Sequence, residues 1–201
     1  MRRIDCVQGT DEWKKARLGV ITASNFSKFI TPGGKASSQA ESEICKLIAE
    51  RITGEPAEVF QTPWMARGTE LEPEARAMFE LFSQETVEQV GLILMDDHDI
   101  GCSPDGLMDG MGLEIKCPAP GTHIKYLRDG GCPPDYYAQI QGAMMVTGAR
   151  YKSWVFMSYH PKMEPLIIEV PRDQKYIDTL EKVLVEATTI INEEVKKHGR
   201  V

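Results

Sequence analysis

A short run of residues combines an apolar strand with two charged side chains, and it limits the folds that this chain can adopt. The run SPDGLMDGMGLEIKCP, residues 103–118, places Glu114 and Lys116 two positions apart on that strand. Side chains two apart on a strand point to the same face, so both charges enter the same environment. Buried charge is costly unless it is paired or bound to a metal. The run therefore predicts either an ion pair at the surface or a site that uses both charges.

Asp105, on a Pro-Gly turn just before this strand, adds a second carboxylate. Mg²⁺ binds carboxylate oxygens, backbone carbonyls and water, so Asp105, Glu114 and the carbonyl of Ile115 form a candidate ligand set. Lys116 would lie beside the metal, where an amine can orient an attacking water or help to deprotonate it. These groups match the needs of phosphodiester hydrolysis. The same residues also fit a turn followed by a surface ion pair, and the short Glu-x-Lys string does not decide between the two.

A third carboxylate is expected near the helix within RGTELEPEARAMFELF, residues 67–82. The apolar stripe of this helix comprises Leu71, Ala75, Met78, Phe79 and Phe82. Among the acids, Glu72 lies nearest to that stripe, about 70° from its centre. Pro73 favours a helix that begins there, with Glu72 just outside it. On geometry alone, an exposed acidic turn is the better interpretation.

Composition predicts a single globular domain over residues 1–201. The five cysteines are an odd number without a Cys-x-x-Cys pair, which favours reduced thiols, a cytosolic setting and no zinc site. No apolar run is long enough to span a bilayer, and the N-terminus lacks the apolar core of a secretory signal. The net charge of −7 argues against a nucleic-acid partner, but residues 1–35 carry seven basic and three acidic residues. Charge alone leaves DNA binding undecided.

The order of expected elements indicates an α/β or α+β fold with helices packed on a mixed sheet. Apolar periodicity and caps predict helices at 10–19, 22–30, 37–54, 71–82, 135–148 and 173–199. Alternating or apolar runs predict strands at 85–95, 98–103, 107–118 (a hairpin), 151–159 and 165–171. Residues 31–38 are expected to form a loop.

Four motifs in the same order carry a family resemblance. They are QGTDEWKKARLGVITAS, RGTELEPEARAMFE, SPDGL followed by GLEIKCP, and YYAQIQGAMMVTG. Together they resemble the lambda-type phage exonucleases, the YqaJ-like alkaline exonuclease family of the PD-(D/E)XK nuclease superfamily. The resemblance runs from about Val7 to the terminal helix. It implies a single α/β domain with a central mixed β-sheet flanked by helices.

The resemblance also implies roles for the acids and the lysine. Asp105, Glu114 and the Ile115 carbonyl resemble the family's metal ligands, and Glu72 matches an additional acid for a second Mg²⁺. Lys116 matches the catalytic lysine. These assignments would place two Mg²⁺ ions in each active site, with Mn²⁺ able to substitute.

Four further residues fall on positions that hold a terminal 5′-phosphate in this family: Arg17, Ser24, Ser103 and Gln141. A forked guanidinium, two hydroxyls and an amide are suited to hold a phosphate with free oxygens. Apart from the resemblance, each fits an ordinary role: Arg17 as a surface cation, Ser24 as a helix cap and Gln141 as an amide on a helix face.

The implied activity is Mg²⁺-dependent digestion of one strand of linear duplex DNA from its 5′ end, which leaves a 3′ overhang. The family further implies a ring-shaped homotrimer, a single-strand annealing partner, and a phage or prophage protein in the bacterial cytoplasm. Two alternatives remain open. One is a structure- or sequence-specific endonuclease, which would cut closed circles, and the other is a DNA-binding module without catalysis.

Overall fold

Two four-stranded sheets form the frame of the protein in the computed structural model, which describes residues 1–57 and 63–199. The first sheet has the order β1 (Arg2–Ile4), β3 (Leu92–Leu94), β4 (Ile100–Cys102), β2 (Ile21–Thr22). The second has the order β5 (Gly106–Leu107), β6 (Met111–Lys116), β7 (Ser153–Ser158), β8 (Leu166–Pro171). Both sheets mix parallel and antiparallel pairs, which confirms the α/β class. The single central sheet that was expected is divided into two sheets. The predicted domain 1–201 includes residues 58–62 and 200–201, which lie outside the described residues.

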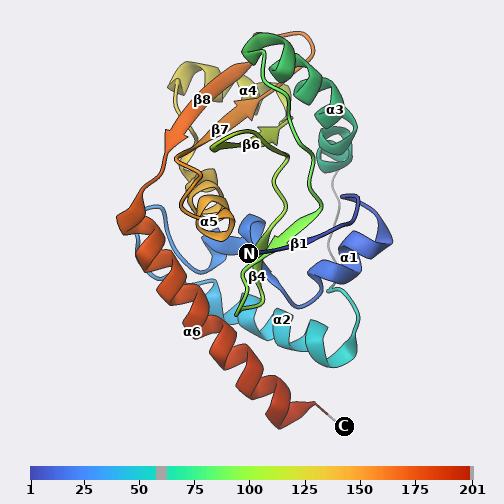
Figure 1. Cartoon of the computed structure of the whole chain (residues 1–201), viewed down its shortest axis with the longest axis vertical. Helices are drawn as coiled ribbons and strands as arrows, with labels where there is room; N and C mark the ends of the chain where they lie inside the picture. The colour runs from blue at the N-terminus through green and yellow to red at the C-terminus, as the bar shows by residue number, and fades with distance from the viewer. Residues whose placement is uncertain (58–62, 200–201) are drawn as a thin grey trace.

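Helices account for most of the remaining described chain (Figure 1). They are α1 (Asp11–Arg17), η1 (Ala23–Lys28), α2 (Ala40–Thr53), α3 (Pro63–Ser83), α4 (Pro120–Asp129), η2 (Pro134–Tyr136), α5 (Tyr137–Thr147) and α6 (Gln174–His198). Two local signals act as expected: the Thr10 side chain caps α1, and Gly54 ends α2 in the left-handed conformation. The segment 22–30 is a 3₁₀ helix over six residues. Helix α4 was not predicted, although Pro120 and Gly130 mark its two ends.

Helix α5 joins the two sheets into one unit. It packs against β4 of the first sheet, β7 of the second, and the helices η1 and α6 (Figure 1). Its residues are buried on every side, as expected for a helix in the centre of a domain. Gly142 allows the closest approach, because a Cβ atom there would lie 2.0 Å from the Phe26 ring. One apolar core therefore holds both sheets at a fixed separation.

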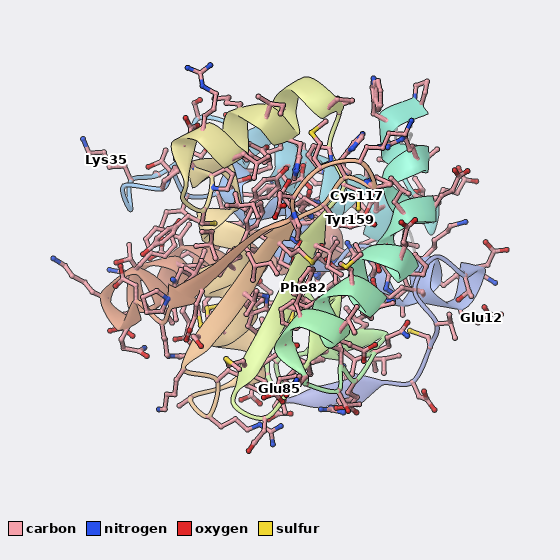
Figure 2. All side chains as sticks on the ribbon, turned by 90° about the horizontal axis from the view of Figure 1, so that it is seen from above. Glu12, Lys35, Phe82, Glu85, Cys117 and Tyr159 are labelled. Atoms are coloured by element: carbon pink, nitrogen blue, oxygen red, sulfur yellow. The ribbon has the colours of Figure 1, made fainter. Side chains whose placement is uncertain are left out.

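Helix α3 covers one face of the second sheet. Ala75 and Phe79 pack on Leu113 and Ile115 of β6 in a separate apolar cluster. The prediction that Phe82 belongs to this buried stripe is wrong: its side chain is 61% exposed (Figure 2). Phe82 is not part of the apolar cluster that Ala75 and Phe79 form with β6.

The start of α3 also differs from the prediction. The helix begins at Pro63 and contains Pro73 in its interior, so Glu72 lies within it. Proline is tolerated in a helix interior where the surrounding packing outweighs the lost hydrogen bond. The contacts of Ala75 and Phe79 with the sheet supply that packing here.

Over residues 1–57 and 63–199, no helix combines the length and the apolar character that a membrane crossing requires.

Candidate active site

Strand β6 carries the Glu-x-Lys pair at the centre of the second sheet. Glu114 pairs with Phe156 and Lys116 with Ser158 in the parallel ladder to β7. The Lys116 Nζ donates to Glu114 Oε1 at 2.5 Å, and the Glu114 side chain is only 3% exposed. Of the two interpretations that the sequence left open, the surface ion pair is excluded because this pair is largely buried.

Asp105 approaches the same strand from the turn between the two sheets. Its Oδ2 accepts a hydrogen bond from the Ile115 N–H at 2.6 Å, which brings the Ile115 backbone to the carboxylate. Gln8 fixes this turn by donating to the carbonyl of Pro104 at 2.8 Å. Burial raises the pKa of Asp105, and the charge of Glu114 raises it further. The turn thus holds a second acid close enough to Glu114 for the two charges to repel.

Glu72 reaches this group from α3. Arg76, one turn later on the helix, donates from Nη2 to Glu72 Oε1 at 2.5 Å and from Nε to the Asp105 carbonyl at 2.9 Å. The charge of Glu72 is among the causes that raise the pKa of Asp105. The structure therefore brings together all four residues predicted as catalytic: Glu72, Asp105, Glu114 and Lys116. Below, this group is called the acid cluster.

Lys116 is the only cation among these four. Burial by itself lowers its pKa, but the charges of Glu114 and Asp105 outweigh burial and raise the pKa of Lys116 overall. With both carboxylates charged, Lys116 is held as an ammonium ion. This form suits orienting a water molecule and stabilising negative charge better than accepting a proton.

The donor chemistry of the acid cluster fits Mg²⁺. Carboxylates from three elements and a backbone carbonyl are hard oxygen ligands, and neither histidine nor thiolate is needed. In the described part of the chain, however, no three His, Cys, Asp or Glu side chains are arranged so that they could hold a metal ion together. Each carboxylate instead has a donor: Arg76 for Glu72, the Ile115 N–H for Asp105 and Lys116 for Glu114. A divalent cation would take over oxygens that these donors now hold.

A second group of polar side chains surrounds Arg17. Arg17 donates to the hydroxyls of Ser103 (3.0 Å), Thr22 (3.1 Å) and Ser24 (3.2 Å). Burial lowers the pKa of Arg17, while the nearby charge of Glu114 opposes this shift. Within residues 1–57 and 63–199, its hydrogen bonds go to hydroxyl oxygens and none to a carboxylate. Three of the four predicted phosphate-binding residues, Arg17, Ser24 and Ser103, thus lie together, and with Thr22 they form the group here called the Arg17 pocket.

Trp13 supports the Arg17 pocket. Its indole N–H donates to the Ser103 hydroxyl at 3.0 Å and to the Gly91 carbonyl at 3.2 Å. The Arg17 guanidinium carbon lies 4.3 Å from the centroid of the Trp13 ring, within the range of a cation–π contact. Trp13 and Arg17 are four apart on α1, so the helix itself brings them together. The sequence analysis did not connect Trp13 with Arg17, although this spacing was visible.

Gln141 does not lie with the other predicted phosphate-binding residues. It is fully buried, its Nε2 donates to the Pro171 carbonyl, and its Oε1 accepts from the Asp173 N–H. Both ends of its amide therefore hold the segment before α6. Gln139 faces the acid cluster instead, with its Nε2 2.6 Å from Glu114 Oε1. Residues two apart on a helix lie about 200° apart, so only one of these glutamines can face the site.

A cleft of about 900 Å³ leads to the acid cluster between the N-terminal segment and α3. Glu72 and Asp105 line it, together with Trp13 and Lys14. The opposite side of α3 is tied to the sheet, because the Tyr159 hydroxyl donates to Glu74 at 2.6 Å. Figure 2 shows Tyr159 beside Cys117, the residue that follows Lys116. The carboxylates are thus reached from one side and braced from the other.

An acid cluster built on a Glu-x-Lys strand, with a guanidinium pocket beside it on this α/β frame, defines a nuclease of the PD-(D/E)XK type. The YqaJ-like viral recombinase domain family matches residues 12–150, and the chain belongs to this family.

Solved structures agree with this assignment. The alkaline exonuclease LHK-Exo from Laribacter hongkongensis is 34% identical, covers 94% of this chain and 95% of its own, and superposes with a TM-score of 0.84. LHK-Exo in complex with dAMP gives the same identity and coverage and a TM-score of 0.83. A phage-related exonuclease from Haemophilus somnus 129PT is 15% identical over 89% of this chain and 96% of its own, with a TM-score of 0.66, which supports the fold alone. A comparison with curated proteins finds no match.

Proposed function

We propose that this protein is a Mg²⁺-dependent 5′-to-3′ exonuclease that degrades one strand of linear duplex DNA and leaves a 3′ overhang. The supporting observation is the turn 103–105. Ser103 of this turn belongs to the Arg17 pocket and Asp105 to the acid cluster. A single residue, Pro104, thus separates in the chain a group suited to a terminal phosphate from a group suited to hydrolysis.

The Arg17 pocket accounts for direction. A terminal phosphate has more free oxygens and more charge than an internal phosphodiester, so a partly buried guanidinium with three hydroxyls favours the end of a strand. A nucleotide held there by its 5′-phosphate would present its next phosphodiester bond to the acid cluster. Cleavage at that bond releases a mononucleotide and leaves a new 5′-phosphate on the strand.

The acid cluster provides the chemistry in this proposal. Glu72, Asp105, Glu114 and the Ile115 carbonyl would hold two Mg²⁺ ions, with Mn²⁺ as a substitute. When bound, such ions polarise the phosphoryl oxygen and lower the pKa of a bound water. Lys116 as an ammonium orients the water and offsets charge that develops on the phosphate. Gln139 fixes the rotamer of Glu114 by donating to its carboxylate.

The wider biology in this proposal rests on the family. Members resemble one another in forming a homotrimeric ring that encircles duplex DNA, and in working with a single-strand annealing protein in phage-type recombination. Both are proposed here, together with action in the bacterial cytoplasm. A ring would allow processive digestion by a chain whose net charge is −7.

A digestion assay on three substrates tests the proposal. Linear duplex with 5′-phosphate ends should be degraded fastest, linear duplex with 5′-hydroxyl ends more slowly, and covalently closed circles not at all. Chelation of divalent cations should stop all digestion. Cutting of closed circles would favour the endonuclease alternative, and survival of linear duplex with and without Mg²⁺ would favour the non-catalytic one. Equal rates on the two kinds of linear end would contradict the role of the Arg17 pocket.

A further inference from the structure

Tyr136 stands beside the acid cluster, yet neither the sequence motifs nor the proposed function gives it a role. It ends η2 and immediately precedes α5. Its ring stacks on Phe156 of β7 with centroids 5.2 Å apart and an interplanar angle of 27°. The Tyr126 ring packs edge-on against it at 6.4 Å. Two aromatic side chains therefore hold the orientation of the Tyr136 ring.

This ring faces the catalytic lysine. The Lys116 Nζ lies 5.2 Å from the Tyr136 ring centroid, within the range at which an ammonium ion is attracted to an aromatic face. The Tyr136 hydroxyl points elsewhere, 3.5 Å from the hydroxyl of Tyr126. The part of Tyr136 that meets Lys116 is thus the ring, not the hydroxyl.

Lys116 needs a second contact because its salt bridge is shared. Glu114 Oε1 accepts from both Lys116 and Gln139, and Glu114 is also a proposed metal ligand. Because the Glu114 carboxylate would contact Lys116, Gln139 and a metal ion, it does not by itself fix the position of the Lys116 ammonium. An aromatic face attracts the ammonium without competing for carboxylate oxygens, and it leaves the N–H groups free to bind water.

We propose that Tyr136 is a positioning residue that holds the Lys116 ammonium through its aromatic face. The proposal rests on the proposed function, in which Lys116 orients the attacking water. Tyr136 acts through Lys116 and touches no reacting atom. Phe156 and Tyr126 hold the Tyr136 ring in place. The ring can therefore keep the Lys116 ammonium in position whether or not Glu114 binds a metal ion.

Three variants separate this role from core packing. Tyr136→Leu removes the ring, and Tyr136→Phe keeps the ring and removes the hydroxyl. Tyr137→Leu is the matched control, because the adjacent Tyr137 ring packs on Tyr176 of α6, with centroids 4.9 Å apart, and does not face Lys116. If Tyr136→Leu does not fold, Tyr136→Met carries the same test with a flexible side chain of similar length.

The first measurement is NMR of the protein without added metal, which does not depend on activity. Protons over an aromatic face resonate upfield, so the Lys116 ε-CH₂ signal should be shifted upfield in the wild type. It is assigned by its loss in Lys116→Ala. The shift should persist in Tyr136→Phe and Tyr137→Leu and disappear in Tyr136→Leu. An unshifted wild-type signal, or a shift unchanged in Tyr136→Leu, would overturn the contact itself.

The second measurement is steady-state digestion of 5′-phosphorylated duplex. Tyr136→Leu should lower kcat about tenfold with KM within about twofold, the size expected for a partly buried cation–π contact. Tyr136→Phe and Tyr137→Leu should stay within about twofold of wild-type kcat. A loss in Tyr136→Phe equal to that in Tyr136→Leu would assign the role to the hydroxyl, and an unchanged Tyr136→Leu would remove it. If the NMR shift behaves as expected but wild-type protein digests no DNA, the proposed function fails and the contact stands.

Discussion

The Arg17 pocket and the acid cluster are neighbours that differ in charge. Positive charge is in excess in the Arg17 pocket, and negative charge is in excess in the acid cluster. In the Arg17 pocket, one partly buried guanidinium is surrounded by neutral hydroxyls, and desolvation lowers the pKa of Arg17. In the acid cluster, Glu72 pairs with Arg76 and Glu114 with Lys116, whereas burial and the charge of Glu114 raise the pKa of Asp105. The first group favours an added anion and the second an added cation. Each of these two pKa shifts means that the charged form of the side chain is less stable in the folded protein than it is in water.

The two groups also differ in how they are built. The Arg17 pocket lies beside the first sheet, on α1 and the segment after β2, and most of its residues are close in sequence. The acid cluster joins Glu72 of α3 to Asp105 and the two charged residues of β6, which are close to one another in sequence but distant from Glu72. A local helix can set the first geometry, whereas the second depends on the packing of α3 on the sheet. The following substitutions test this contrast, from the largest expected effect to the smallest.

Glu114→Gln should have the largest effect, because it removes charge from the most buried acid of the cluster. We expect the rate of Mg²⁺-dependent duplex digestion to fall on the order of 10³-fold, equivalent to several kcal/mol of transition-state stabilisation. Glu169→Gln, at an exposed position on β8, is the control and should retain the wild-type rate. More than a tenth of the wild-type rate in Glu114→Gln would exclude the cluster as the catalytic centre.

Arg17→Lys keeps the positive charge of the pocket and loses the forked geometry. Digestion from 5′-phosphate ends should slow by about 10- to 100-fold, the value of one or two charge-assisted hydrogen bonds. Digestion from 5′-hydroxyl ends should change by no more than about threefold. Lys15→Arg, at an exposed position of the same helix, is the control. An equal loss on both kinds of end would show that Arg17 does not read the terminal phosphate.

The two glutamines of α5 should separate activity from stability. Gln139→Ala removes a donor to Glu114 and should lower the digestion rate about tenfold while the free energy of unfolding stays within about 0.5 kcal/mol. Gln141→Ala leaves the Pro171 carbonyl and the Asp173 N–H unpaired and should cost about 2 kcal/mol in urea denaturation. The reverse pattern, with activity lost in stable Gln141→Ala, would restore Gln141 to the phosphate-binding set.

Trp13→Phe should have the smallest effect, because it keeps an aromatic ring, although a smaller one, beside Arg17 and removes the indole N–H. Loss of the bonds to Ser103 and Gly91 should raise KM for 5′-phosphorylated ends about threefold. KM for 5′-hydroxyl ends serves as the internal control and should not change. A change of the same size on both ends would place the effect in folding rather than in the Arg17 pocket.

Prediction from sequence succeeded where the signal was local. The Thr10 cap, the Gly54 stop and the strands β3 and β4 within the expected runs 85–95 and 98–103 each depend on residues that are near in the chain. The shared face of Glu114 and Lys116 follows from the two-residue period of a strand, and the structure has it.

The failures share one physical cause, which is packing between elements. Pro73 favoured a new helix start, but contacts of α3 with the second sheet carry the helix through it. Phe82 fits the apolar stripe of α3 but is exposed. Neither the exposure of one turn of a helix nor the strength of a distant contact is visible in a local window of sequence.

The amino-acid sequence by itself determined the α/β class, the acids and the lysine of the site, and the cation of the Arg17 pocket, because these follow from residue type, period and motif order. Only the tertiary structure decided which glutamine faces Glu114, where Glu72 lies and what holds Lys116. Those outcomes depend on the rotation of α3 and α5 about their axes, and burial against the two sheets sets that rotation.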